Sequence, residues 1–152
     1  MEQSTLLEVR DLRVEYTSGQ SVVHALNGVS FDLHRGETLG LVGETGAGKT
    51  TTALSILRLL PDRTGHIRSG EIVFDGIPLL GLNEHAMEAI RGARISMIFQ
   101  DPMTALNPVI PVGKQIEEAL FLHNTDGLPW SALGSRVDEI LGMVGIAPER
   151  KK

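Results

Sequence analysis

The chain begins with two stretches in which apolar and polar residues alternate. The first covers residues 7–16, with one interruption of the alternation at Asp11, and the second covers residues 29–33. Alternation with a period of two is typical of a strand that buries one face, and such strands usually pair antiparallel. The start of the sequence therefore predicts antiparallel, half-exposed strands.

The next segment joins a short apolar run to a glycine-rich turn. Residues 39–42 are apolar on both faces, which predicts a strand covered on both sides, as in the middle of a parallel sheet. From about Gly48 the apolar residues recur at helical spacing, and Pro61 cannot continue a helix. The sequence LVGETGAGKTTT, residues 41–52, therefore lies where a strand is expected to turn into a helix.

Further along, the pattern changes from strands to helices. Residues 71–74 predict a strand that ends in a turn at Asp75–Gly76. Asn83 is expected to cap a helix that ends near Arg91, and residues 94–99 predict another strand. Two helical patterns follow, formed by Val112, Ile116, Ala119 and Leu120, and by Leu133, Val137, Ile140, Leu141 and Val144. We therefore expect an α/β fold whose last part is helical.

The turn at residues 43–50 has the pattern G-x-x-x-x-G-K-[ST]. Its glycines allow backbone N–H groups to point inward at phosphate oxygens, and the helix that follows adds the positive end of its dipole. Lys49 supplies a charge for the outer phosphates, and the Thr50 hydroxyl can ligate Mg²⁺. Because the pattern lies between an apolar run and a helix, we interpret it as a nucleoside triphosphate site rather than a chance match. The expected binding residues are Gly43, Glu44, Thr45, Gly46, Ala47, Gly48, Lys49, Thr50 and Thr51.

The composition excludes several other classes of protein. The chain has 152 residues, 41% hydrophobic and 22% charged, as in a folded domain rather than a disordered one. A formal net charge of −5 argues against a nucleic-acid partner. There is no cysteine, and the five histidines show no metal-ligand spacing. The start lacks the features of a signal peptide, and no apolar run reaches about 18 residues, so a membrane role would go through a partner.

Three stretches, in this order, resemble one family. They are LLEVRDLRVEY at residues 6–16, VGETGAGKT at 42–50 and RISMIFQDPMTALNPV at 94–109. The third looks like the glutamine-loop region of ABC transporter ATPases. Its residues most resemble those of the oligopeptide and dipeptide importer branch. The resemblance extends over about residues 6–146. It implies a P-loop NTPase fold of the ABC type, with an antiparallel β-subdomain and a parallel-sheet core.

The resemblance also implies roles for single residues. Tyr16 would stack against the adenine ring of ATP, and Gln100 would be the catalytic residue that contacts Mg²⁺ and positions the attacking water. Thr50 and Gln100 would be the Mg²⁺ ligands, and residues 101–108 would begin the face that meets the membrane subunit. Without the resemblance, Tyr16 would be interpreted as edge packing, Gln100 as an ordinary polar residue and Asp101 as a turn starter.

Partners and location follow from the same resemblance. The protein would lie on the cytoplasmic face of the inner membrane, bind the transporter's membrane subunits and dimerise with a second nucleotide-binding subunit. A solute-binding protein would be an indirect partner. The implied function is import of oligopeptides or dipeptides, driven by ATP binding and hydrolysis. Nickel or another small solute stays possible, because the residues that select cargo belong to other subunits.

Several motifs of the family are missing from the sequence. No apolar run ends in the Asp-Glu pair that holds Mg²⁺ and activates water, and we find no LSGGQ-like signature and no switch histidine. We therefore expect a nucleotide-binding domain truncated in its helical subdomain. Residues 1–103 would be the β-subdomain and ATP-binding core, and residues 104–152 the glutamine-loop exit and the start of the helical subdomain. Whether this chain hydrolyses ATP stays open, and the alternative is a non-catalytic remnant that binds nucleotide or the membrane subunit without turnover.

Overall fold

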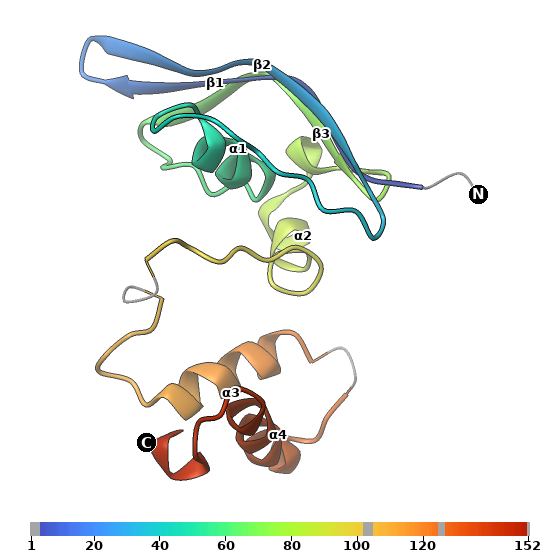
Figure 1. The fold of residues 1–152 in the computed structure, drawn as a ribbon, viewed down its shortest axis with the longest axis vertical. Coiled ribbons are helices and arrows are strands. Elements are labelled where there is room, and N and C mark those ends of the chain that lie inside the picture. Colours follow the sequence, from blue (N-terminus) through green and yellow to red (C-terminus); the bar gives the residue numbers. More distant parts are fainter. Residues whose placement is uncertain (1–3, 102–104, 125–126, 152) are drawn as a thin grey trace. The chain divides into compact units, whose positions relative to one another are not determined.

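The structure is a computed structural model that describes residues 4–101, 105–124 and 127–151. The chain forms two compact units, Met1–Glu88 and Ala89–Lys152. The first unit contains a sheet with a helix against it, and the second contains a pair of helices (Figure 1).

The first unit combines strands and helices, and the elements of the second unit are helices. The first unit contains β1 (Thr5–Ser18), β2 (Ser21–His34), α1 (Lys49–Ile56), β3 (Gly65–Phe74), β4 (Ile77–Pro78), the 3-10 helix η1 (Leu79–Gly81) and α2 (Glu84–Glu88). The second contains α3 (Val112–Leu122), α4 (Trp130–Met143) and the 3-10 helix η3 (Pro148–Lys151). The strands form one sheet in the order β2-β1-β3-β4 with antiparallel neighbours, which confirms the strands predicted near residues 7–16 and 29–33.

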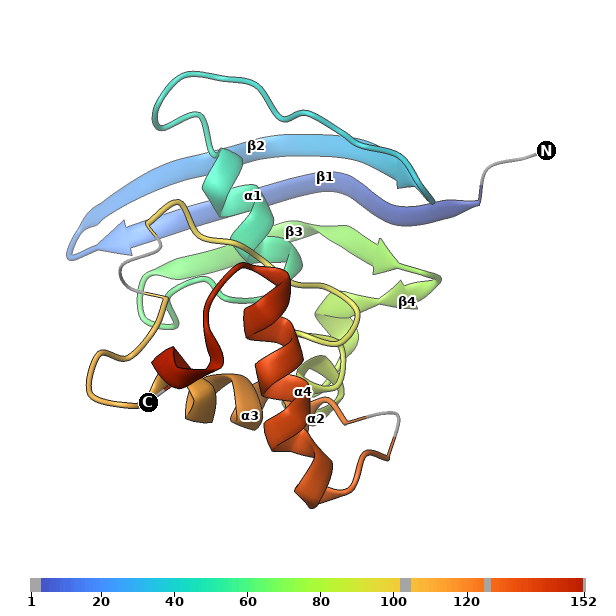
Figure 2. The ribbon, with the colours of Figure 1, turned by 60° about the horizontal axis from the view of Figure 1, so that its bottom comes forward.

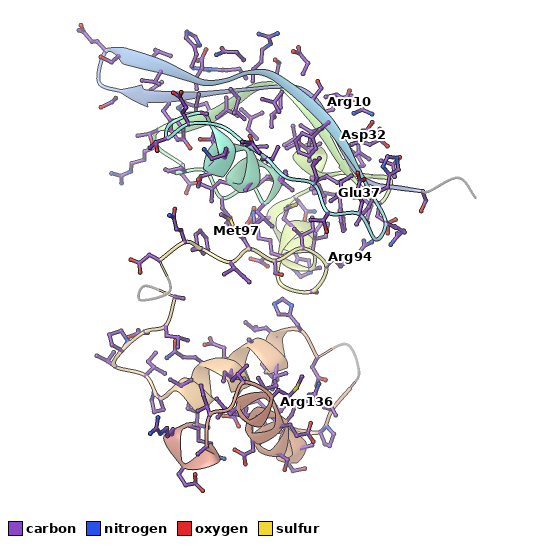
Figure 3. The ribbon with its side chains drawn as sticks, viewed as in Figure 1. Arg10, Asp32, Glu37, Arg94, Met97 and Arg136 are labelled. Carbon is purple, nitrogen blue, oxygen red and sulfur yellow. The ribbon has the colours of Figure 1, made fainter. Side chains whose placement is uncertain are left out.

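The two faces of the sheet differ in chemistry. Helix α1 lies across one face (Figure 2), and β1 buries its alternating apolar residues, which are Leu7, Val9, Leu12 and Val14. Between these positions, Arg10 on β1 pairs with Asp32 on β2, with 2.5 Å between Nη1 and Oδ1 (Figure 3). The hydrogen bond from Arg10 holds the pKa of the Asp32 carboxyl below its ordinary value. The alternation in the sequence thus separates a buried face from a charged one.

The interruption at Asp11 is a bulge that extends across three strands. Asp11 has a φ of 41°, and the register of β1 shifts at this point against both β2 and β3. On β3, Gly70 has a φ of +107°, and a Cβ there would lie 2.6 Å from Leu12 Cα. On β2, a Cβ at Gly28 would lie 2.6 Å from the Asp11 carboxylate. Glycine on both neighbouring strands therefore makes room for the bulge.

Two of the predicted strands do not form. Residues 39–42 are irregular, and Val42 is 98% exposed. Residues 94–99 are irregular apart from one isolated bridge between Arg91 and Ile95. A strand requires a neighbouring strand to pair its backbone N–H and C=O groups, and neither segment has one among the described residues. The prediction of a parallel strand at residues 39–42 was therefore wrong for this structure.

Helix α1 is shorter than predicted. It ends at Ile56 rather than near Pro61, because Arg58 adopts a left-handed conformation with a φ of 53°. The Leu59 N–H then donates to the Leu54 carbonyl at 2.8 Å, which closes the C-terminal end of the helix.

The smaller local predictions are mostly confirmed. The Ala86 N–H donates to Asn83 Oδ1 at 2.9 Å, as expected of a helix cap, although α2 ends at Glu88 rather than Arg91. The turn at Asp75–Gly76 has φ values of 50° and 77°, as a two-residue hairpin turn requires.

Helices α3 and α4 confirm the two helical patterns of the second unit. Helix α4 buries Leu133, Val137 and Leu141 and packs against α3. At the start of α3, a Cβ on Gly113 would lie 3.0 Å from the Lys151 carbonyl oxygen, so η3 also lies close to α3.

Replacing Gly70 with alanine should destabilise the first unit, because the new Cβ would meet the backbone of β1 at a strained φ. Gly76→Ala is the matched control, since its φ is +77° but nothing lies within 4 Å of its Cβ. In urea unfolding, we expect Gly70→Ala to lose at least about 2 kcal/mol more than Gly76→Ala. Equal losses would contradict the packing of Gly70 against the bulge.

Candidate phosphate-binding site

The glycine-rich loop is fixed to the sheet at its C-terminal end. Gly48 has a φ of +83°, and a Cβ there would lie 2.5 Å from a methyl group of Leu26 and 2.7 Å from the Ala25 carbonyl oxygen. Only glycine fits this close approach to β2 at that φ. The contact places the first residues of α1 directly beside the sheet.

The start of α1 leaves its N–H groups available to an anion. Its N-cap is Gly48, and no side chain caps the helix. The hydroxyls that follow bond backward instead, since Thr52 donates to the Gly48 carbonyl at 3.0 Å and Ser55 donates to the Thr51 carbonyl at 2.7 Å. Uncapped N–H groups and the helix dipole together favour a phosphate at this position.

Lys49 lies across the loop. Its ammonium donates to the Gly43 carbonyl at 2.5 Å and to the Glu44 carbonyl at 2.7 Å. A turn closes the loop, with the Ala47 N–H donating to the Glu44 carbonyl at 3.1 Å. One positive charge is therefore held between the entry of the loop and the start of the helix.

The other loop residues are open to solvent. Gly43, Glu44, Thr45, Gly46, Ala47 and Thr50 are exposed, and Thr51 is half-buried. Thr50 is the second residue of α1, so its exposed side chain lies at the helix start, next to the uncapped N–H groups. A hydroxyl in this place is a suitable Mg²⁺ ligand.

Tyr16 lies close to the same helix. It pairs with Val23 on β2 and with Gly65 on β3, and a Cβ at Gly65 would be 3.1 Å from the Tyr16 ring. The Tyr16 hydroxyl is 3.5 Å from Thr51 Oγ1 on α1. The structure thus brings the predicted aromatic and the phosphate loop together within the first unit.

The charged side chains beside Tyr16 are paired with one another. Glu15 accepts a hydrogen bond of 2.6 Å from Arg68 Nε, and its other oxygen is 3.0 Å from His24 Nδ1. The hydrogen bond from Arg68, together with the charges of Arg68 and His24, holds the pKa of the Glu15 carboxyl below its ordinary value. Side chains from β1, β2 and β3 therefore form an ion-paired cluster beside Tyr16.

The remaining predicted site residues belong to the second unit. Gln100 and Asp101 are exposed in an irregular segment, and the role of Gln100 with Mg²⁺ and water stays a prediction. Residues 102–104 of the expected membrane-subunit face lie outside the described residues.

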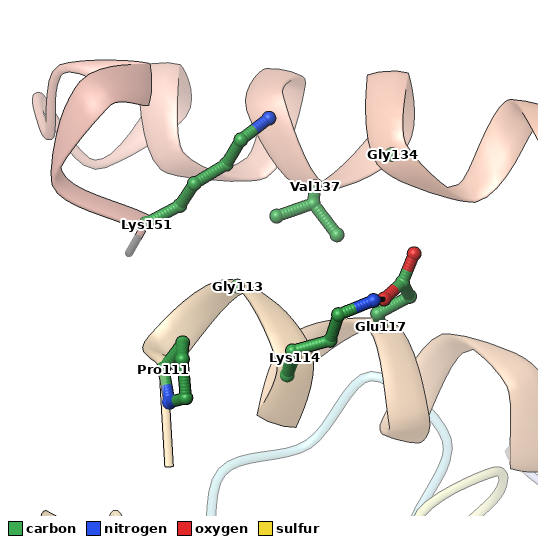
Figure 4. A pocket seen from close by; sticks show the side chains of 7 residues that line it. All are labelled: Pro111, Gly113, Lys114, Glu117, Gly134, Val137 and Lys151. Carbon is green, nitrogen blue, oxygen red and sulfur yellow. Dashed lines mark hydrogen bonds and ion pairs between the residues drawn. The ribbon is translucent and has the colours of Figure 1, made fainter.

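A cavity in the second unit is less suited to a triphosphate than the loop at residues 43–50. It has a volume of about 380 Å³ and lies between α3, α4 and η3 (Figure 4), where it is lined by Pro111, Gly113, Lys114, Glu117, Gly134, Val137 and Lys151. Both lysines already have carboxylate partners, with 2.6 Å from Lys114 to Glu117 and 2.6 Å from Lys151 to Asp138. The positive charge of this cavity is therefore largely neutralised.

Within the described ranges, no three His, Cys, Asp or Glu side chains gather as a metal site would require. Among the same residues, no helix has the length and hydropathy needed to cross a bilayer.

Comparison with known proteins identifies clear relatives. A family model described as "ABC transporter" matches residues 26–152. The oligopeptide transport ATP-binding protein OppD of Bacillus subtilis is 46% identical over 97% of this chain and 40% of its own length. The probable peptide ABC transporter ATP-binding protein y4tR of Sinorhizobium fredii is 50% identical over 96% of this chain and 43% of its own length. The chain thus spans less than half the length of these relatives.

Solved structures confirm the fold. The dimeric ATP-binding cassette MJ0796, in a post-hydrolysis state bound to ADP and Pi, matches with a TM-score of 0.76 at 23% identity, over 92% of this chain and 57% of that one. The protein cbiO1 from Clostridium perfringens matches with a TM-score of 0.64 at 26% identity, over 95% and 52% of the two chains. The predicted P-loop fold class is therefore correct.

Gly48→Ala should weaken binding of a nucleoside triphosphate, because its Cβ would push the loop away from β2. Strain of order 1–3 kcal/mol predicts a loss of about 5- to 150-fold in affinity, measured with a fluorescent nucleotide. Gly40→Ala is the control, since its Cβ would have nothing within 4 Å. Equal affinity of the two variants would show that the contact with β2 does not shape the site.

Proposed function

The chain belongs to the ABC transporter family, and from this premise we propose that it is the ATP-binding part of a transporter that imports peptides by binding and hydrolysing ATP. The names of the relatives support peptides as the cargo, because OppD, y4tR and a dipeptide transport protein, DppD of Bacillus subtilis, are all named for peptide transport. DppD is 46% identical over 93% of this chain and 42% of its own length.

The position of Lys49 carries the proposal. Its ammonium lies between the carbonyls of Gly43 and Glu44, beside a helix start that has no side-chain cap. Phosphate oxygens entering this loop would replace the two carbonyls as acceptors for the ammonium and would receive hydrogen bonds from the backbone N–H groups. The geometry therefore suits a ligand with several neighbouring phosphates.

Tyr16 would bind the adenine base of the nucleotide. Its ring is partly exposed beside β2 and β3, and its hydroxyl lies near Thr51 on the same helix that begins the phosphate loop. An aromatic ring at this place can stack on adenine while the phosphates extend toward Lys49.

Thr50 and Gln100 would complete the metal site. Bound Mg²⁺ would neutralise charge on the outer phosphates. The exposed Thr50 side chain at the start of α1 supports its role as a ligand. The Gln100 amide would both accept from and donate to a water molecule, so it would orient the attacking water without adding charge.

The proposal extends to partners and location. We propose that membrane subunits bind the face that begins at residues 101–108, that a second nucleotide-binding subunit completes a dimer, and that a solute-binding protein acts indirectly. The protein would then work at the cytoplasmic face of the inner membrane. Residues 1–103 would be the β-subdomain and ATP-binding core, and residues 104–152 the glutamine-loop exit and the start of the helical subdomain.

Lys49→Ala should weaken ATP binding by about 10- to 150-fold, because a charge-assisted hydrogen bond contributes roughly 1.5–3 kcal/mol. Lys114→Ala, which removes an ion-paired lysine of α3, is the control and should bind ATP as the unaltered chain does. A phosphate-release assay run beside the binding titration separates the two candidate functions. ATP turnover by the chain would exclude the non-catalytic alternative, and unchanged affinity of Lys49→Ala would remove Lys49 from the site.

Tyr16→Ala should reduce ATP affinity by about 5- to 150-fold, since base stacking contributes ~1–3 kcal/mol. Tyr16→Phe keeps the ring and loses only the 3.5 Å contact with Thr51, so its affinity should stay within about twofold of the original. If both variants lost affinity equally, the hydroxyl rather than the ring would be the binding group.

A further inference from the structure

The regular pairing of β1 is interrupted on both sides near Tyr16. On the β2 side, the register shifts between Val14 and Glu15, as it does at a bulge. On the β3 side, Tyr16 pairs with Gly65, which is the first residue of that strand. The ladder of backbone hydrogen bonds therefore holds β1 less firmly at Tyr16 than in the middle of the sheet.

The Glu15 side chain links β1 to both neighbouring strands at this place. One carboxylate oxygen accepts a hydrogen bond of 2.6 Å from Arg68 Nε on β3, and the other lies 3.0 Å from His24 Nδ1 on β2. The side chain of Glu15 is only 20% exposed, whereas its two partners are more than half exposed. Partial burial strengthens contacts of a charged group, so Glu15 is the centre of this cluster.

Glu15 and Tyr16 lie on opposite faces of the sheet. Successive side chains of a strand point to opposite faces, and Tyr16 is on the face of α1, where its hydroxyl is 3.5 Å from Thr51 Oγ1. The Glu15 carboxylate therefore lies on the face away from α1 and would not touch a nucleotide stacked on Tyr16. Its effect on the base would pass through the backbone of β1.

The residue that follows Tyr16 is tied to β3 as well. Thr17 Oγ1 lies 3.3 Å from His66 Nε2, so both sequence neighbours of Tyr16 contact β3 through their side chains. The Tyr16 ring also packs closely on that strand, since a Cβ at Gly65 would lie 3.1 Å from it. A shift of β1 against β3 would therefore move the ring relative to its surroundings.

We infer that Glu15 is a positioning residue for nucleotide binding, which fixes the ring of Tyr16 through the backbone of β1. Its contacts with Arg68 and His24 hold β1 between its two neighbours and so keep the ring at one place beside the phosphate loop. This inference rests on the proposed function, because it assumes that Tyr16 stacks on the base. A ring that is already fixed loses little freedom when the base binds, which raises affinity for the nucleotide.

Titrations with ATP and with inorganic tripolyphosphate separate base binding from phosphate binding. Glu15→Ala should lower ATP affinity about three- to tenfold, because its contacts to both neighbouring strands are lost, and should leave tripolyphosphate affinity within about twofold. Retained tripolyphosphate affinity also shows that the variant is folded. Glu15→Gln keeps an acceptor for Arg68 and should lose less. Glu8→Ala is the matched control, since Glu8 lies on the same strand and pairs with Arg10 of that strand.

A double-variant cycle shows whether Glu15 acts through Tyr16. In a chain that carries Tyr16→Ala, the further change Glu15→Ala should lower ATP affinity by less than about twofold, because the ring that Glu15 positions is absent. Tyr16 is the single tyrosine of the chain, so the ring signals of labelled tyrosine belong to it alone. Without nucleotide, these signals should shift or broaden in Glu15→Ala and stay unchanged in Glu8→Ala.

The outcomes separate the inference from the proposed function. Equal losses of ATP and tripolyphosphate affinity in Glu15→Gln, or an undiminished effect of Glu15→Ala in the Tyr16→Ala chain, would overturn the positioning role and leave the proposed function intact. Unchanged ATP affinity in Glu15→Ala would overturn that role as well. Failure of the unaltered chain to bind ATP would overturn the proposed function, and the inference with it.

Discussion

The close approach of Gly48 to β2 is the constraint on which the first unit depends. A side chain at this position would overlap both Leu26 and the Ala25 carbonyl, so the backbone can enter α1 at this point only as glycine. The approach fixes where α1 begins relative to the sheet. It therefore also fixes where the uncapped N–H groups and Lys49 lie, and the distance from them to Tyr16 on the neighbouring strand.

Both units use the same means to hold an irregular segment in place. In the first unit, Lys49 spans the phosphate loop by bonding the carbonyls of Gly43 and Glu44. In the second unit, Gln115 bonds the backbone of residues 107–110, which precede α3. A long side chain from the first turn of a helix thus orders the loop that precedes it. Lys49 keeps a charge for a ligand, whereas Gln115 uses its whole amide on the loop.

Local features were predicted well from the sequence, and features that depend on distant partners were not. The interruption at Asp11 has a short-range signal and is a register shift in the structure, and the helix predicted from about Gly48 begins at Lys49. Residues 39–42 are apolar on both faces, but apolarity does not specify a neighbouring strand, and the segment is irregular. The contact of Gly48 with Ala25 joins residues far apart in the sequence, so no local pattern indicates it.

The most direct test of this account is an NMR titration of the chain with ATP and Mg²⁺, following the backbone amides of both units. The account predicts that the shift changes concentrate at residues 43–51, with a ring-current effect around Tyr16, and saturate with one ATP per chain. Shift changes centred on the cavity between α3 and α4, or no saturable change at residues 43–51, would contradict it.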